Sequence, residues 1–318
     1  MAMASRFRRI LFGSFAGAGL YFGPFLPSPL VWHKAIPNLL PGLFRHKGSH
    51  THRLTLGPDE DEMEEILHTS VSKVSVVIPV YNEGAENLIQ NLERLDQSTL
   101  GKSCTEVIVV DAGCSDDTME ALVKADMRIP VRVLRSKHGR GQALSAGAES
   151  ATGDILLFLH ADTLLPTGYD EVLRNKLADK KVLMTAFSFE INVENAEDST
   201  ASFRNGIKRL EYFTNIRARN FWLPYGDQAL AMRRSAYKEV GGVKRLKMME
   251  DFELVSRVRR IALENGGRIE ILPEHAKCSP RRWEKNGIAK NSVLNWTFVA
   301  AYVWAGISPD TIFEYYYK

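Results

Sequence analysis

Acidic side chains and one imidazole stand at the ends of three apolar runs in this sequence. The residues are Glu83, Asp111, His160 and Asp162. Each run is short and rich in β-branched or aromatic residues, which is the pattern of a buried strand. Ligands on mostly parallel sheets gather outside the carboxyl ends of the strands, where the loops meet. We therefore expect these side chains to converge on one crevice that can hold a charged ligand.

The third run predicts a metal site. His160 and Asp162 are two residues apart, so both side chains can face one divalent ion. Mg²⁺ or Mn²⁺ suits an oxygen-rich site shared with a diphosphate, where it neutralises charge on a nucleoside diphosphate leaving group. A structural alternative stays open, in which Asp162 caps the next turn and His160 is an ordinary polar residue.

The first two runs offer contacts for a nucleoside. Asp111 precedes a glycine turn and the start of a helix, so its carboxylate can accept from a base N–H or a ribose hydroxyl. Glu83 is placed in the same way, and the stretch from Pro79 to Tyr81 adds an aromatic face that can stack on a base. For both acids a capping role is the alternative.

Two further sites carry charge at expected helix starts. Arg140 lies between glycines, where helix N–H groups and a forked guanidinium favour phosphate, although the stretch lacks a Walker sequence and also fits a surface turn. Glu250 and Asp251 open an amphipathic segment, and Asp251 is the candidate base that deprotonates an acceptor hydroxyl. The alternative is that both acids serve the helix dipole.

Strand-like and helical stretches alternate in the first half of the chain. Strands are expected at 74–80, 106–111, 131–134 and 154–159, with helices at 86–95, 116–125 and 139–151. Right-handed crossovers place such helices on both faces of a mostly parallel sheet. The second half, with strands expected near 183–191 and 268–272, should pack beside that sheet. The sequence thus predicts an α/β fold.

Composition is that of an ordinary globular protein. The chain has 318 residues, 45% of them hydrophobic, and a formal charge of +3 from 41 basic and 38 acidic residues. This balance does not suggest a nucleic-acid partner. The three cysteines have neither a disulfide-framework pattern nor zinc-like spacing.

The first part of the chain differs from the rest. Three arginines precede an uncharged run at 10–32, which is long enough to cross a bilayer but is interrupted by glycines and prolines. We expect residues 1–35 to be a targeting or membrane-associated segment, and residues 36–72 to be a polar linker. The protein would then be organelle-targeted or membrane-anchored, and otherwise cytoplasmic.

In this order, the motifs resemble those of the family 2 glycosyltransferases. The resemblance covers roughly residues 73–306. A narrower likeness is to a subgroup labelled arsenosugar-biosynthesis glycosyltransferase-like, carried by the histidine at 160, by Gly226-Asp227-Gln228 with the following stretch 232–235, and by Trp283. The resemblance implies a GT-A fold, which is a Rossmann-like three-layer sandwich. It also implies a nucleotide-diphospho-sugar donor, a divalent metal, and inverting transfer by direct displacement.

Roles carry over from the resemblance position by position. Glu83 and Asp111 match nucleoside contacts, and Asp162, with His160 beside it, matches the metal position. Asp251, with Glu250 adjacent, matches the base. The remaining positions match the acceptor side, and they are Gly226, Asp227, Gln228 and Trp283. The chain departs from the usual pattern at His160, which replaces the first aspartate of the metal motif, and at Ala112, which replaces a second aspartate after Asp111.

The resemblance divides residues 73–318 into a nucleotide-sugar half (73–165), an acceptor half (183–290) and a C-terminal apolar helix (291–318). That helix is expected to dock on the domain, with contact to a membrane or a lipid-linked acceptor as the alternative. Two other functions stay open. A nucleotidyltransferase acting on a sugar phosphate would release pyrophosphate, and a non-catalytic nucleotide-sugar-binding protein would bind without turnover.

Overall fold

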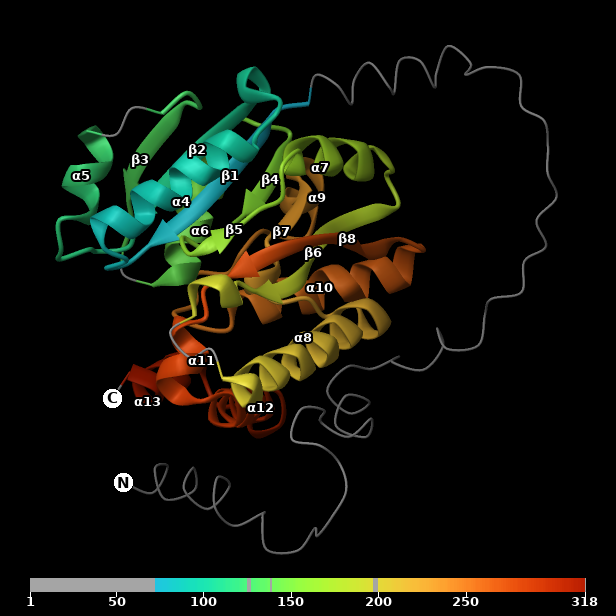
Figure 1. The fold of residues 1–318 in the computed structure, drawn as a ribbon. Coiled ribbons are helices and arrows are strands. Elements are labelled where there is room, and N and C mark those ends of the chain that lie inside the picture. The colour runs from blue at the N-terminus through green and yellow to red at the C-terminus, as the bar shows by residue number, and fades with distance from the viewer. Residues whose placement is uncertain (1–71, 125–126, 138, 197–199, 318) are drawn as a thin grey trace, which may run out of the picture.

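The computed structural model describes residues 72–318, except 125–126, 138, 197–199 and 318 (Figure 1). The predicted targeting segment at 1–35 and all but the last residue of the predicted linker at 36–72 lie outside the described residues.

One mixed sheet organises the described part of the chain. Its strands are β1 (Val74–Val80), β2 (Thr105–Asp111), β3 (Val131–Arg135), β4 (Ile155–Phe158), β5 (Thr163–Leu164), β6 (Val182–Ile191), β7 (Leu230–Arg233) and β8 (Arg268–Cys278). They lie in the order β3-β2-β1-β4-β7-β6-β8-β5. The first four are parallel, as expected, and β6 runs parallel to β8. The β4–β7, β6–β7 and β5–β8 pairs are antiparallel.

Helices cover both faces of this sheet (Figure 1). They are α4 (Ala85–Ser98), α5 (Thr118–Lys124), α6 (Arg140–Ser150), α7 (Tyr169–Ala178), α8 (Ala201–Phe221), α9 (Arg234–Glu239), α10 (Glu250–Asn265), α11 (Arg281–Asn286), α12 (Ile288–Ala305) and α13 (Pro309–Tyr317). Helices α4, α5 and α7 share one apolar core with the sheet, whereas α6, α9, α10 and α12 share the other. The three-layer α/β sandwich expected from the sequence is confirmed.

Successive side chains of the central strands point to opposite faces of the sheet and therefore pack into both cores. In β1, Val77 faces the α6 and α10 core, while Val76 and Ile78 face the α4 and α7 core. Because both faces are covered, the strand is buried along its length and reads as a continuous apolar run. This burial fixes the register, and it aligns the strand ends that carry the polar loops.

The strand expected at 154–159 forms as β4, and the chain leaves this strand before His160. One stretch differs from expectation. The C-terminal stretch 291–318 is not a single helix, since α12 ends at Ala305, Gly306 follows with a φ of 61°, and α13 begins at Pro309. Glycine adopts this left-handed conformation readily, so it terminates the helix.

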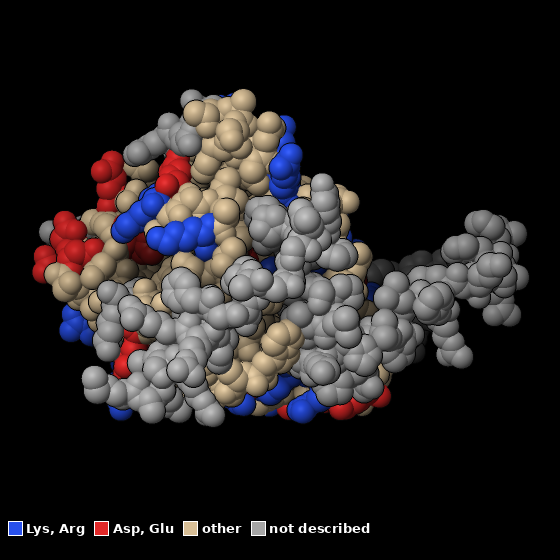
Figure 2. Space-filling view, turned by 90° about the horizontal axis from the view of Figure 1, so that it is seen from below, with Lys and Arg blue, Asp and Glu red and all other residues tan. Residues whose placement is uncertain are grey.

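Two further observations concern membrane spanning and surface charge. No helix within the described residues combines the length and apolarity needed to cross a membrane. Figure 2 shows basic and acidic side chains lying close to one another on one face of the molecule. This mixture agrees with the near-balanced formal charge of +3.

Candidate active site

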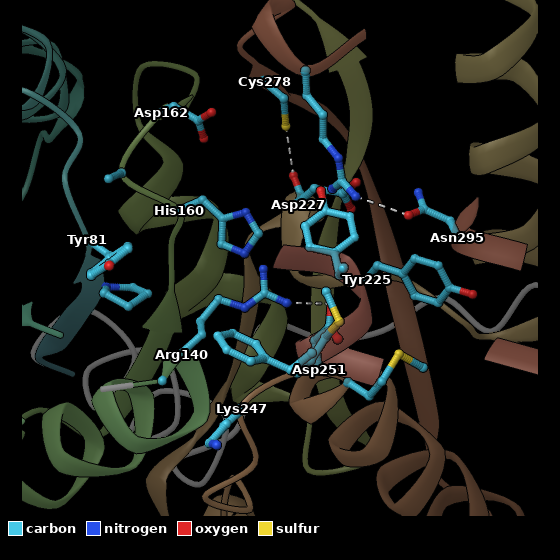
Figure 3. Close-up of a pocket in the computed structure, with 18 of the residues that line it drawn as sticks. Tyr81, Arg140, His160, Asp162, Tyr225, Asp227, Lys247, Asp251, Cys278 and Asn295 are labelled. Carbon is cyan, nitrogen blue, oxygen red and sulfur yellow. Dashed lines mark hydrogen bonds and ion pairs between the residues drawn. The ribbon is translucent and has the colours of Figure 1, made fainter. Parts of the chain in front are cut away.

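A cavity of about 670 Å³ opens at the carboxyl ends of β1 and β4 (Figure 3). One side is formed by the end of β1, the loop after β4 and the first turn of α6, and the other by α10, α11, α12 and α13. Nine of the predicted site residues line it, namely Pro79, Tyr81, Glu83, Arg140, His160, Asp162, Asp227, Asp251 and Trp283. The structure therefore brings most of the predicted residues into one crevice.

The Asp251 carboxylate is fixed by backbone donors where α10 borders the cavity. Its Oδ2 accepts from the N–H of Gly226 at 2.9 Å, and its Oδ1 accepts from the N–H of Phe252 at 2.7 Å. Burial works to raise the pKa of Asp251, but the charge of Arg140 and these two donors outweigh it and hold the pKa below its usual range. The carboxylate is consequently ionised at neutral pH.

Arg140 lies between two carboxylates. Its Nε donates to Glu250 Oε1, and its Nη2 lies 3.8 Å from Asp251 Oδ2. Glu250 is fully buried and does not line the cavity; burial raises its pKa, whereas the charge of Arg140 lowers it. The predicted phosphate contact of Arg140 thus has an acidic side chain on either side in the free protein.

His160 and Asp251 both lie against Gly226. A Cβ atom added to Gly226 would lie 2.9 Å from His160 Nε2 and 3.1 Å from Asp251 Oδ2, so the three groups are in close contact and only glycine fits between them. Burial lowers the pKa of His160 to about 4, and the charge of Arg140 acts in the same direction. The imidazole is therefore neutral at pH 7. Figure 3 shows Asp162 set apart from the ring.

Asp162 and Glu83 share one arginine at the opposite end of the cavity. Arg281 Nη2 lies 3.0 Å from Glu83 Oε2 and 3.7 Å from Asp162 Oδ2. Burial raises the pKa of Glu83, and the nearby charge of Asp162 raises it further, against the effect of Arg281. Sequence reasoning missed Arg281; its signal is the pair of adjacent arginines that follows the last strand.

The residues present fit a divalent ion only if the donor supplies ligands. Within the described residues, no group of three or more His, Cys, Asp or Glu side chains could hold a metal ion. Mg²⁺ is commonly held by one or two carboxylates together with substrate phosphates and water. Asp162 meets that requirement because it lines the cavity and its side chain is 34% exposed.

Besides Glu250, three predicted residues are held in structural interactions outside the cavity lining. Asp111 Oδ1 accepts from the N–H groups of Gly113 and Cys114 at 2.9 and 2.7 Å. Burial works to raise the pKa of Asp111, and these bonds with the charge of Arg135 lower it on balance. Gln228 is fully buried and its Nε2 donates to the carbonyl of Phe187 at 3.0 Å. Gly226 contributes its N–H to Asp251, as described above.

Tyr81 and Asp227 complete the predicted set. Tyr81 is 48% exposed beside Pro79, so its ring stands at the mouth of the cavity. Burial raises the pKa of Asp227, and its Oδ1 is buried without a hydrogen-bond partner among the described residues.

Apolar side chains of α10, α12 and α13, most of them aromatic, form an apolar wall whose residues sequence reasoning did not name as site residues. The apolar wall consists of Phe252, Phe298, Val299, Phe313 and Tyr316. Phe298 and Tyr316 stack edge to face with ring centroids 5.7 Å apart. Arg282 and Lys247 stand next to this wall in the cavity lining. Trp283, found through the family resemblance, and the alternative of a lipid-linked acceptor for the stretch 291–318 pointed to this region.

The fold and the cavity define an α/β protein with a polar ligand site at the ends of parallel strands. The sequence profile of "Glycosyl transferase family 2" matches residues 75–241, more than half of the 318 residues, and the chain belongs to this family.

Curated relatives share a shorter region. The chain is 36% identical over 107 residues to an undecaprenyl-phosphate 4-deoxy-4-formamido-L-arabinose transferase of Klebsiella pneumoniae, covering 32% of each chain. It is 38% identical over 102 residues to the protein of the same name from Salmonella paratyphi B, covering 30% of this chain and 31% of the relative. The chain thus matches about a third of the length of these relatives.

Solved structures give weaker likenesses. A mannosyltransferase of Pyrobaculum calidifontis in complex with GDP-Man and Mn²⁺ has a TM-score of 0.48 and 19% identity, covering 65% of this chain and 56% of its own. S. aureus TarS 1-349 in complex with UDP has a TM-score of 0.47 and 20% identity, covering 70% and 66%. The family assignment does not rest on these scores.

Proposed function

We propose that the chain is an inverting glycosyltransferase that moves a sugar from a nucleotide-diphospho-sugar to an acceptor hydroxyl. One observation carries the proposal: a single cavity holds the ionised Asp251 at one end and the carboxylates of Glu83 and Asp162 at the other. This arrangement provides a base and a donor end within one family 2 domain.

The donor end binds the nucleotide and the ion. The nucleoside lies against Pro79 and Tyr81, with Glu83 as its polar contact. Asp111 was predicted as a second contact, but its carboxylate is held by Gly113 and Cys114 outside the cavity. Asp162 would hold Mn²⁺ or Mg²⁺ together with the diphosphate, and such an ion would supply positive charge to the leaving group. His160 was predicted as a second ligand, but its ring lies against Gly226, so we propose Asp162 as the protein ligand of the ion.

The acceptor end supplies the base. As the acceptor oxygen bonds to the anomeric carbon, Asp251 takes the hydroxyl proton, and the bond from that carbon to the diphosphate breaks. The electron pair leaves with the nucleoside diphosphate. Gly226 and Phe252 orient the Asp251 carboxylate through their N–H groups, and Glu250 holds Arg140 beside it.

The acceptor itself is proposed to carry an apolar body. The apolar wall begins at Phe252, next to Asp251, and continues along α12 and α13. A second candidate acceptor is the phosphate of a lipid, which the names of the curated relatives and the nearby Lys247 and Arg282 favour. A phosphate is already a nucleophilic anion and needs no base, so the two acceptors differ in their dependence on Asp251.

The test is release of nucleoside diphosphate from a panel of nucleotide sugars by the full chain, with Mn²⁺ or with a chelator. For a hydroxyl acceptor, Asp251→Asn should lower release by about 10²-fold or more because the base is lost. Glu264→Gln, an exposed acid on the same helix, is the matched control and should be unchanged.

Near-normal activity of Asp251→Asn would favour the phosphate acceptor. Release of pyrophosphate would instead indicate a nucleotidyltransferase, and donor binding without release a non-catalytic protein.

Two further assignments are proposed on sequence grounds. The stretches 226–228 and 232–235 with Trp283 place the chain with the arsenosugar-biosynthesis-like subgroup, a label that does not specify the acceptor. The arginines and the uncharged run before residue 33 suggest a segment that targets the protein to an organelle or anchors it to a membrane.

A further inference from the structure

Arg281 bridges two loops at the donor end of the cavity. It lies in the first turn of α11, directly after β8, and its Nε donates to Ser279 Oγ at 3.1 Å. Its Nη2 contacts Glu83, which follows β1, and Asp162, which follows β4. One guanidinium group therefore neutralises two carboxylates that come from different strand ends.

The two carboxylates need a cation. Glu83 and Asp162 approach the same nitrogen of Arg281, at 3.0 and 3.7 Å, so their like charges lie close together and repel each other. In the free protein Arg281 offsets this repulsion. In the donor complex the same Asp162 would hold a divalent ion beside the diphosphate, so the ion and Arg281 compete for one carboxylate.

Another cation can replace Arg281 in its ion pairs with Glu83 and Asp162. The Arg281 side chain is 53% exposed and the two carboxylates are 30% and 34% exposed. Exposed ion pairs of this kind contribute little to stability, so a stronger ligand can replace the guanidinium at small cost. Once released, a guanidinium is also suited to bind phosphate oxygens in a bidentate manner.

We propose that Arg281 is the resident counter-ion of the donor site: it occupies Asp162 in the free protein and yields it to a divalent ion when the donor diphosphate enters. The proposal rests on the proposed function, because it takes Asp162 as the ligand of the ion. It makes the free protein a weak metal binder, and it couples metal binding to the arrival of the diphosphate.

The experiment measures Mn²⁺ binding to the full chain without any nucleotide, from the electron paramagnetic resonance signal of free Mn²⁺. Arg281→Gln should bind Mn²⁺ about three- to tenfold more tightly than the unaltered protein, because Asp162 loses its competitor. Lys285→Gln removes the same charge from the same helix but leaves the Arg281–Asp162 pair in place, and it should bind as the unaltered protein does. Adding Asp162→Asn to Arg281→Gln should abolish the gain.

Equal or weaker Mn²⁺ binding by Arg281→Gln would overturn the proposal and leave Arg281 as a tie between α11 and the β1 loop. A second titration separates this failure from failure of the donor site. It uses inorganic pyrophosphate with Mn²⁺ on the unaltered protein, as the part common to all donors. If pyrophosphate binds while Arg281→Gln shows no gain, only the role of Arg281 is wrong. If pyrophosphate does not bind, the donor site and the role of Arg281 both fall.

Discussion

Because Gly226 has no side chain, its backbone N–H can approach and position the candidate base Asp251. The backbone N–H of Gly226 holds Asp251 Oδ2, and its Cα faces the His160 ring at the same time. A Cβ here would approach His160 Nε2 to 2.9 Å, which is closer than carbon and nitrogen tolerate without a shift. The resemblance placed Gly226 on the acceptor side, and the structure shows which contact requires a glycine.

We therefore expect Gly226→Ala to lower the rate of nucleoside diphosphate release by about 10-fold or more, because misplacement of a catalytic group by about 1 Å costs up to about 10²-fold. The melting temperature, recorded in parallel, should change much less than the rate. Combining Gly226→Ala with His160→Ala removes the clashing imidazole and should restore part of the lost activity relative to His160→Ala alone. Full activity of Gly226→Ala would show that the close packing of Gly226, His160 and Asp251 is not needed.

The role of a single residue could be predicted where it follows from adjacent sequence, and not where it depends on residues far away in the sequence. Asp251 and Asp162 were found because acids at element ends are visible in the sequence, and both line the cavity. The convergence of His160 with Asp251 was not visible, because it depends on the direction in which the loop after β4 turns. Arg281 reaches Glu83 across 198 positions, a contact that no local pattern encodes.

At the scale of elements, Glu106 ties the first strands together. It opens β2, is 4% exposed, and accepts from Ser75 Oγ at 2.6 Å and from the N–H and Oγ1 of Thr152 at 2.8 Å each. Lys73 and Arg132 pair with its other oxygen at 3.4 and 3.3 Å. Burial acts to raise its pKa, but these bonds and charges together lower the pKa to about 2. One carboxylate thus connects β1, β2, β3 and the turn before β4.

This pKa predicts how stability depends on pH. The folded-state value of about 2 lies below the ordinary value of 4.5, so the ionised carboxylate favours folding. Its contribution is present above pH 4.5 and is lost as the pH falls towards 2. Glu106→Gln should lower the free energy of unfolding at pH 7, measured with urea, and the difference from the unaltered protein should shrink on acidification. The exposed Glu120→Gln is the control, and a pH-independent loss in Glu106→Gln would contradict the linkage.

Elements were predictable where local pattern and tertiary packing agree. Three elements were expected within one residue of their observed bounds, namely the strands at 74–80 and 106–111 and the helix at 139–151. The sequence of each has the pattern of a buried element, and the fold does bury each of them. Strand β7 was not expected, because Leu230–Arg233 has only four residues and owes its place to antiparallel pairing with β4 and β6. Helix α7 was also missed, and with it the buried Asp170–Arg174 ion pair that fastens this helix.

At the scale of the whole molecule, the cavity joins the two ends of the described chain. The donor end comes from β1, β4 and their loops, whereas the apolar wall comes largely from α12 and α13, the last helices (Figure 1). An enzyme built in this way can change its acceptor by altering the C-terminal helices while the donor end stays constant. If the apolar wall is the acceptor surface, changes there should leave donor binding intact.

Phe313→Ala tests this division, since Phe313 lines the cavity from α13 next to Lys247. We expect kcat/KM for an amphiphilic acceptor to fall about 10-fold, because burial of one aromatic side chain against the acceptor is lost. Donor affinity, measured by calorimetry in the absence of acceptor, should be unchanged. Tyr315→Ala changes an exposed ring on the same helix and serves as the control.

The probes are an alkyl glycoside, which offers hydroxyls, and a short polyprenyl phosphate, which offers a phosphate. A fall in donor affinity with unchanged use of either acceptor would place the apolar wall at the donor end and would remove the argument for an acceptor with an apolar body.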